Sequence, residues 1–312
     1  MFLSLFSLEV QDFMASFFVS IPGAAAQGII WGIMAIGVYI TYRILDFADL
    51  TVDGSFGTGG AAFAMCTIGG MNVYLSLLVA FIAGCLAGLA TGIFHTAFGI
   101  PPILAGILTQ LALYSVNLDI MGQSNQALNA SKYNFIVNLL EYKKSIIVGL
   151  IFVAIIIAVL YWFFGTELGH SIRATGNNQN MARANGINTN VNKVIALVLS
   201  NGIVAISGAL LAQFQGFSDI NMGRGAIVIG LAAVIIGEVI FGKIFKNFAL
   251  KLIAAVIGGV IYYIVITLVV ALGLPANDLK LFTAIVVAIF LGVPYWKNKV
   301  IRKKIKGGAA NA

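Results

Sequence analysis

Long apolar segments alternate with short polar loops along most of this chain. Nine segments are predicted to form membrane spans, since about 20 apolar residues in a helix cross the hydrocarbon core. They are Ala24–Tyr42, Gly54–Ile68, Val73–Phe94, Pro102–Leu118, Ile146–Phe164, Val194–Leu211, Gly225–Phe241, Leu252–Leu272 and Leu281–Tyr295. The second and seventh are short and interrupted by glycine, so either could re-enter the membrane instead of crossing it. The pattern predicts an all-α polytopic membrane protein with eight or nine transmembrane helices.

Composition supports a membrane environment for the whole chain. Of the 312 residues, 60% are hydrophobic and 9% are charged, whereas a soluble domain carries about 25% charged residues. Backbone N–H and C=O groups in lipid must form hydrogen bonds within the protein, which leaves helices or closed barrels. The apolar runs are continuous and not alternating, so they favour helices. The expected organisation is an N-terminal interfacial segment (1–20), a transmembrane domain (21–296) and a basic tail (297–312). The short interfacial helix is expected to end before the first span.

The distribution of basic residues predicts the orientation, because cytoplasmic loops are enriched in Lys and Arg. Most basic residues fall on one side of the predicted topology: Arg43, Arg173, Arg183, Lys193, Lys243, Lys246, Lys251, Lys297, Lys299, Arg302, Lys303, Lys304 and Lys306. The loop 165–193 and the C-terminal tail are therefore expected in the cytoplasm, and 119–145 outside. Met1–Ser20 contain no Lys or Arg, which favours an outside N-terminus. The net charge of +7 is explained by this topology and does not indicate nucleic-acid binding.

The longest polar stretch between two spans is 165–193, which reads GTELGHSIRATGNNQNMARANGINTNVNK. Asn177 is predicted to cap a short helix over Asn178–Ala184, and Gly186 to end it in a left-handed conformation. Asn190 is a predicted cap for the span that follows. A loop that only connects two spans is usually much shorter. The sequence therefore predicts a docking element, with an ordinary solvated loop as the alternative.

Two glycine-broken segments occupy corresponding places in the two halves of the chain. RILDFADLTVD leads into GSFGTGGAAFAMCTIGG, and QGFSDINMGR leads into GAIVIGLAAVIIGEVIFGK. Such a pair indicates an inverted repeat around a central pathway. The alternative is that glycine serves only to let helices pack closely.

Three carboxylates precede the first glycine-broken segment. Asp46, Asp49 and Asp53 are spaced to share one face of a helix, and carboxylates at membrane depth indicate function. The face would suit a substrate with an amino group. Alternatively, Asp53 caps its own helix, Asp46 pairs with Arg43, and Asp49 lies in interfacial water. The candidate pathway residues are Asp46, Asp49, Asp53, Ser55, Thr58 and Ile227.

No motif in the chain predicts catalysis, a cofactor or a metal. GEVIFGKI over 237–244 approaches a phosphate-binding loop but lacks the Ser or Thr that holds magnesium, and it ends an apolar span. Glu238, in that stretch, is expected within reach of Lys243. His95 and His170 stand alone in the sequence. These residues therefore predict no nucleotide site and no enzymatic activity in the chain itself.

The polar loop also carries a family resemblance. GHSIRATGNNQNMARANGIN, followed by a span ending GALLAQFQG, resembles the signature region of branched-chain amino-acid-type permeases, the membrane subunits of ABC importers. ILDFADLTVDGSFGTGGA resembles the first conserved block of that family, in particular of its aromatic amino-acid (tryptophan/tyrosine) branch. The resemblance extends from about Gly28 to Pro294.

This resemblance implies a type II ABC importer-like fold and a division of labour between subunits. A separate cytoplasmic ATP-binding subunit would receive the short helix of the loop as a coupling helix. An extracytoplasmic binding protein would deliver the substrate, and a second permease copy would complete the pathway across a bacterial cell membrane. The implied coupling residues are Arg173, Asn180, Met181, Ala182, Arg183, Ala184 and Gly186. An ion-driven secondary transporter, or a nucleoside or sugar permease of the same superfamily, is the alternative.

Overall fold

The structure is a computed structural model that describes residues 2–129, 133–271 and seven positions between 281 and 292, with side chains from residue 17. Most of the predicted ninth span, Leu281–Tyr295, lies outside the described residues. The basic tail 297–312 lies wholly outside them. Both stay predictions.

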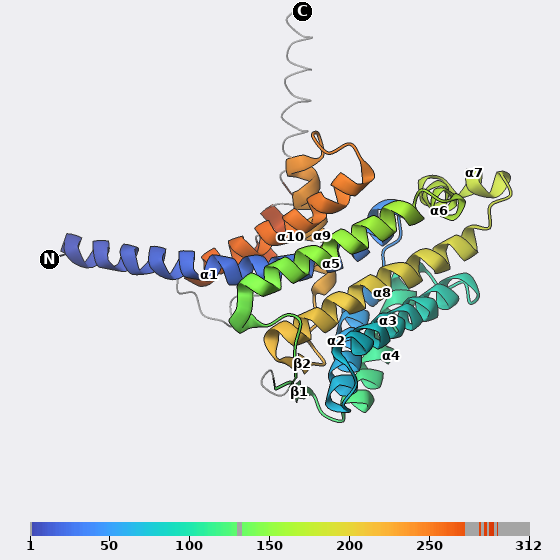
Figure 1. Ribbon diagram of the computed structural model, residues 1–312. Helices are drawn as coiled ribbons and strands as arrows, with labels where there is room; N and C mark the ends of the chain where they lie inside the picture. Colours follow the sequence, from blue (N-terminus) through green and yellow to red (C-terminus); the bar gives the residue numbers. More distant parts are fainter. Residues whose placement is uncertain are drawn as a thin grey trace, which may run out of the picture.

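The first helix differs from the prediction. α1 runs without a break from Phe2 to Tyr39, with Pro22 inside it, and continues into a π-helical turn, η1 (Ile40–Ile44). Residues 2–20 therefore belong to the helix that also forms the first span, and no separate helix precedes it. In Figure 1 the first turns of α1 extend beyond the other helices.

The described chain is almost entirely helical. Its other helices are α2 (Thr51–Ile68), α3 (Val73–Thr96), α4 (Pro102–Met121), η2 (Leu139–Glu141), α5 (Tyr142–Phe163), α6 (Glu167–Asn177), α7 (Gln179–Ala184), α8 (Thr189–Gln215), α9 (Ala226–Phe241) and α10 (Phe248–Ala271). Among the described residues, six segments are long and apolar enough to cross a membrane: Phe17–Ile44, Val73–Thr96, Pro102–Met121, Leu139–Phe163, Thr189–Gln215 and Phe248–Ala271. α9 is apolar but shorter, and α2 is not among the six. A polytopic helical membrane protein is therefore confirmed, while the count of eight or nine spans stays a prediction.

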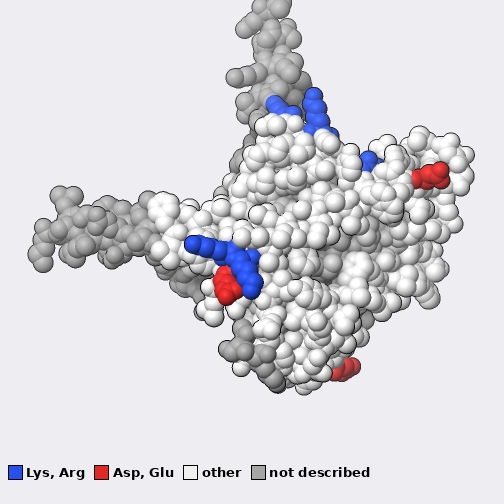
Figure 2. Space-filling model, in the orientation of Figure 1, with Lys and Arg blue, Asp and Glu red and all other residues white. Residues whose placement is uncertain are grey.

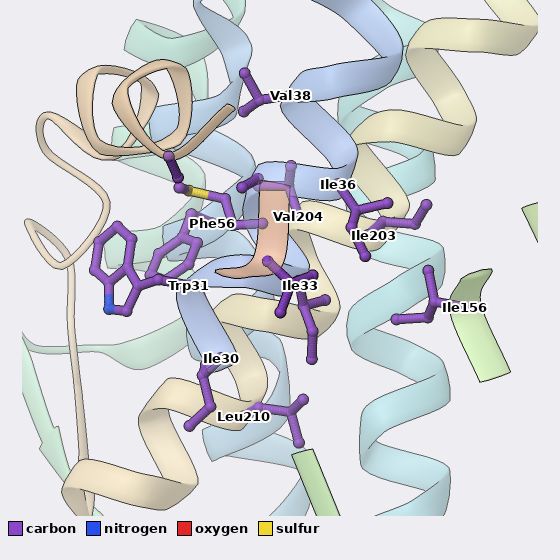
Figure 3. Close-up of a cluster of buried hydrophobic side chains, with 14 of the residues drawn as sticks. Ile30, Trp31, Ile33, Ile36, Val38, Phe56, Ile156, Ile203, Val204 and Leu210 are labelled. Atoms are coloured by element: carbon purple, nitrogen blue, oxygen red, sulfur yellow. The ribbon is translucent and has the colours of Figure 1, made fainter. Parts of the chain in front are cut away.

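The core lies between α1, α8 and their neighbours. α8 packs against α2, α3 and α1, and α1 packs against α10 and α9. In Figure 3, side chains of α1 such as Ile30 and Ile33 lie beside Val204 and Leu210 of α8, and Trp31 lies against Phe56. The Trp31 and Phe56 rings stack with centroids 4.8 Å apart.

Glycine lets these helices approach closely. A Cβ at Gly208 of α8 would collide with the carbonyl oxygen of Phe56 in α2, and one at Gly84 of α3 would collide with that of Asn201. Van der Waals packing and interhelical hydrogen bonds hold membrane helices together, and small residues permit such contact. Close packing therefore accounts for Gly208 and Gly84.

Two short strands, β1 (Asn125–Ala127) and β2 (Phe217–Asp219), pair antiparallel. They follow the ends of α4 and α8 and lie at the opposite end of α8 from α7 (Figure 1). The sequence reading did not predict them. The face of the molecule in Figure 2 is almost wholly uncharged, as expected for a surface that meets lipid.

Candidate coupling loop and translocation pathway

The polar loop between α5 and α8 contains two helices, where the sequence predicted one. α6 begins after Thr166, whose hydroxyl accepts a hydrogen bond from the backbone N–H of Gly169. The sequence reading missed α6, although Thr166 followed by Glu167 is a typical helix start. In Figure 1, α6 and α7 lie together at one end of α5 and α8.

The predicted short helix exists as α7, and its N-cap lies one residue later than predicted. Asn178, not Asn177, caps it, because its Oδ1 accepts a 3.0 Å hydrogen bond from the N–H of Met181. Gly186 follows the helix with φ of 78°, in the left-handed region expected of it. α8 is capped by Asn188, whose Oδ1 accepts from Asn190 and Val191, and not by Asn190 as predicted.

The predicted coupling residues do not all face outward. Met181 is 51% exposed, whereas Ala182 is 1% exposed and packs inside the chain. Asn180, Arg183 and Ala184 are exposed, and the Nε of Arg183 donates to the hydroxyl of Thr189 at 2.9 Å. A partner that contacts α7 would therefore meet Met181 and would not meet Ala182.

Side-chain contacts tie α6 to three other helices. The guanidinium of Arg173 lies 4.4 Å from the ring centre of Phe248 at the start of α10. The Nδ2 of Asn192 in α8 donates to the hydroxyls of Ser171 and Thr175, at 2.6 Å and 2.9 Å. Gly176 approaches the carbonyl oxygen of Ile44 so closely that a Cβ would not fit. The loop is therefore fixed to the ends of α1, α8 and α10.

A cleft of about 880 Å³ lies beside this loop, between η1, α6, α7 and the start of α10. Its charged lining residues are Arg43, Asp46, Arg173, Lys246 and Lys251. Met181 also lines it. The cleft is thus basic overall and adjoins the exposed residue of α7.

The three carboxylates do not share a helical face, so this prediction was wrong. Asp46 and Asp49 lie in the irregular segment between η1 and α2, and only Asp53 is helical. Asp46 is exposed, with φ of 52°. The chain leaves the helical path after Ile44, which removes the periodicity on which the prediction depended.

Asp49 is buried and belongs to a polar network between α2 and α8. It is 2% exposed. Its Oδ1 accepts a 2.9 Å bond from the N–H of Thr51, and its Oδ2 accepts a 2.8 Å bond from the Nδ2 of Asn201. The hydroxyl of Ser55 donates to the Oδ1 of Asn201. Asp49 therefore does not lie in interfacial water, and it fixes the start of α2 to α8.

Asp53 joins the two glycine-broken segments. Its carboxylate accepts hydrogen bonds from the backbone N–H groups of Gly225, at 2.9 Å, and Ile227, at 2.8 Å. It thereby satisfies free N–H groups at the start of α9, where a helix favours negative charge. Asp53 caps α9, and the prediction that it caps its own helix was wrong.

Other predicted contacts are also corrected. Arg43 pairs with Glu238 through a 2.7 Å Nε–Oε1 contact, and not with Asp46. Glu238 was predicted to lie within reach of Lys243, and its ion-pair partner is Arg43 instead. His95 is half-buried, and its Nε2 lies 3.1 Å from the Nζ of Lys193 and its Nδ1 2.8 Å from the carbonyl oxygen of Ile100.

The remaining predicted pathway residues lie around the start of α2 and α9. Ser55 and Thr58 are buried within the chain, and the hydroxyl of Thr58 donates to the carbonyl of Gly54 at 3.0 Å. Ile227 is partly buried in the first turn of α9. Ser55 and Thr58 are therefore enclosed by neighbouring helices in this conformation.

A pocket of about 380 Å³ adjoins Asp53 and contains polar residues that the sequence reading missed. Its polar lining residues include Gln110, Tyr114 and Asn117 of α4, together with Arg224. The three α4 residues are spaced four and three apart, which places them on one helical face. That spacing was visible in the sequence within the predicted span Pro102–Leu118.

These helices and broken segments define a polytopic α-helical membrane protein with a structured polar loop. Residues 20–294 match the family described as the permease component of branched-chain amino acid transport systems, and the chain belongs to this family. A tyrosine transport system permease protein of Clostridioides difficile is 43% identical, with 85% of this chain and 88% of that protein covered. An uncharacterised protein of Rickettsia prowazekii is 34% identical over 86% of this chain and 95% of its own length. A fructose import permease protein of Bifidobacterium longum is 26% identical, with 77% and 68% covered.

Proposed function

We propose that this chain is the membrane permease of an ATP-driven importer for aromatic amino acids, tyrosine or tryptophan. The observation that carries the substrate class is the 43% identity to a tyrosine transport permease over most of both chains. The family membership makes the chain a permease of an ABC transporter. More distant relatives include a fructose permease, so sugars are the competing substrate class within the same machinery.

Coupling to ATP hydrolysis is assigned to the loop 165–193. A cytoplasmic ATP-binding subunit would contact α7 through Met181, whose exposed side chain lies at the rim of the basic cleft. Movement of that subunit would reach the spans through Arg173 and Asn192, because these side chains fix α6 to α10 and α8. The loop and the C-terminal tail are placed in the cytoplasm by the excess of basic residues.

The translocation pathway is assigned to the meeting point of α2 and α9. Their first turns are joined by Asp53, so the two broken segments of the proposed inverted repeat begin at a common region. A second permease copy would complete the pathway, and an extracytoplasmic binding protein would deliver the amino acid. We assign 21–296 to the transmembrane domain and 297–312 to a basic tail, with the part of α1 that precedes the span at the membrane interface.

Cross-linking tests the coupling assignment. Single cysteines replace Met181 or Ala182 in a chain whose native Cys66 and Cys85 are changed to serine and alanine. We expect Met181→Cys to form a cross-link to a co-purified ATP-binding subunit and Ala182→Cys to form none, because only Met181 is exposed. Isolation of the permease with no ATP-binding subunit, or equal cross-linking at both positions, would contradict the assignment.

A further inference from the structure

The pocket beside Asp53 lies where three elements of the membrane domain meet. Its walls come from the first turn of α2, the middle of α4 and the turn that precedes α9. Its volume of about 380 Å³ is within the range of small-molecule sites. The pocket therefore adjoins the first broken segment and the polar turn that leads into the second.

Polar residues line the pocket at membrane depth. α4 has 20 residues and is about 30 Å long at 1.5 Å per residue. Gln110 and Asn117 lie about 12 Å and about 22 Å from its start, with Tyr114 between them on the same face. Polar groups so far inside a spanning helix are costly and indicate function.

One of these groups is buried without a partner. Asn117 is 2% exposed, and its Oδ1 has no hydrogen-bond partner among the described residues. An unsatisfied buried polar atom costs about 1–3 kcal/mol, so it calls for an explanation. Asn117 lines the pocket, so this acceptor lies beside the space that a ligand would occupy.

The charges around the pocket have opposite signs on different elements. Arg224, on the turn before α9, is exposed and forms no ion pair with any described residue. The carboxylate of Asp53 lies on another wall, with both of its oxygens bound to the start of α9. A positive and a negative group around one small pocket suit a zwitterion.

We propose that this pocket is the site where the permease itself contacts the transported aromatic amino acid, an inference that rests on the proposed function. The guanidinium of Arg224 binds the carboxylate of the amino acid through charge-assisted hydrogen bonds. The Oδ1 of Asn117 accepts from its ammonium group, which the charge of Asp53 also attracts. The ring of Tyr114, 45% exposed, packs against the aromatic side chain.

Because α2 and the turn before α9 both line the pocket, any change in their relative position changes its shape. Binding there is expected to be weak, since Tyr114 and Arg224 remain exposed. The permease would then bind weakly the substrate that is released to it, while the binding protein provides the high affinity.

Substrate protection of an introduced cysteine tests the site. The reporter is Leu111→Cys, which lines the pocket, in the permease that lacks Cys66 and Cys85, purified with its ATP-binding subunit. The matched control is Leu108→Cys, which is also exposed on α4 but does not line the pocket. We expect L-tyrosine to slow modification of Leu111→Cys by a small methanethiosulfonate reagent and to leave Leu108→Cys unaffected.

A second substitution tests the chemistry. Arg224→Gln should raise the half-protecting concentration of L-tyrosine roughly tenfold or more, and should leave that of tyramine, which has no carboxylate, unchanged. Equal protection of both reporters, no protection of either, or an unchanged tyrosine response in a monodisperse Arg224→Gln complex would overturn the proposal. ATP-dependent uptake of tyrosine by the wild-type complex is measured separately, so a wrong pocket is distinguished from a wrong substrate class.

Discussion

Replacing Asp53 should release the start of α9 from α2. Its carboxylate accepts two backbone hydrogen bonds, from Gly225 and Ile227. Asp53→Ala leaves both N–H groups without this acceptor, at about 1–3 kcal/mol each, so the expected loss is about 2–6 kcal/mol. Asp53→Asn retains one acceptor oxygen and turns an amide N–H₂ towards the second donor, so about half of that loss is expected. The loss of negative charge at the helix start adds to both.

The assay is thermal unfolding of the detergent-solubilised protein, followed by size-exclusion chromatography of a fluorescent fusion. The apparent unfolding temperature should fall in the order wild type, Asp53→Asn, Asp53→Ala. Asp119→Asn is the control, because Asp119 is exposed near the end of α4, and it should match the wild type. If both Asp53 variants unfold at the same temperature as the wild type, Asp53 does not hold the broken segments together. A changed substrate preference in a stable Asp53→Asn complex would instead show a direct role in selection.

Three further substitutions follow from the described contacts. Met181→Glu changes an exposed side chain, so the fold should persist while ATP-driven uptake falls roughly tenfold, as expected for loss of an interface anchor; unchanged uptake would exclude Met181 from coupling. Arg173→Gln removes the contact with Phe248 and should lower the free energy of unfolding by about 0.5–2 kcal/mol. Arg173→Lys keeps the positive charge and should lower it by less. Gly208→Val forces α8 away from α2 and should abolish monodisperse protein, whereas Gly23→Ala, with nothing within 4 Å, should not.

The spans could be predicted from their apolar composition and from the polar or turn residues at their ends. The predicted segments at Val73 and Pro102 begin at the same residues as α3 and α4, because polar or turn residues precede each apolar run. The helix at the centre of the polar loop was predicted from its asparagines and Gly186. α6 was not predicted, because its sequence ELGHSIRATGN has too few apolar residues to stand out from the polar loop.

The errors at the candidate site arose from contacts between distant parts of the chain. Asp53 and Ile227 are 174 residues apart, and Arg43 and Glu238 are 195 apart. For Asp53, Arg43 and Glu238 the sequence offered a nearby partner, and the fold supplied a different one. Local spacing cannot report that the chain leaves its helix after Ile44 and begins a new one at Thr51.

The polar face of α4 illustrates a signal that was present but not used. Gln110, Tyr114 and Asn117 have helical spacing, yet the apolar residues between them made the segment read as an ordinary span. Only the position of α4 beside the start of α2 shows that this face lines a pocket. A search for polar residues at helical spacing inside each predicted span would have found it.

The most direct test of the central claim is uptake of radiolabelled L-tyrosine into proteoliposomes that contain the permease and its ATP-binding subunit, with the binding protein outside. We expect uptake when ATP is trapped inside the vesicles, and none with ADP or with an imposed sodium or proton gradient alone. L-Tryptophan should compete, and fructose should not. Uptake driven by an ion gradient without ATP would contradict an ATP-driven importer, and ATP-driven uptake of fructose but not tyrosine would contradict the aromatic substrate class.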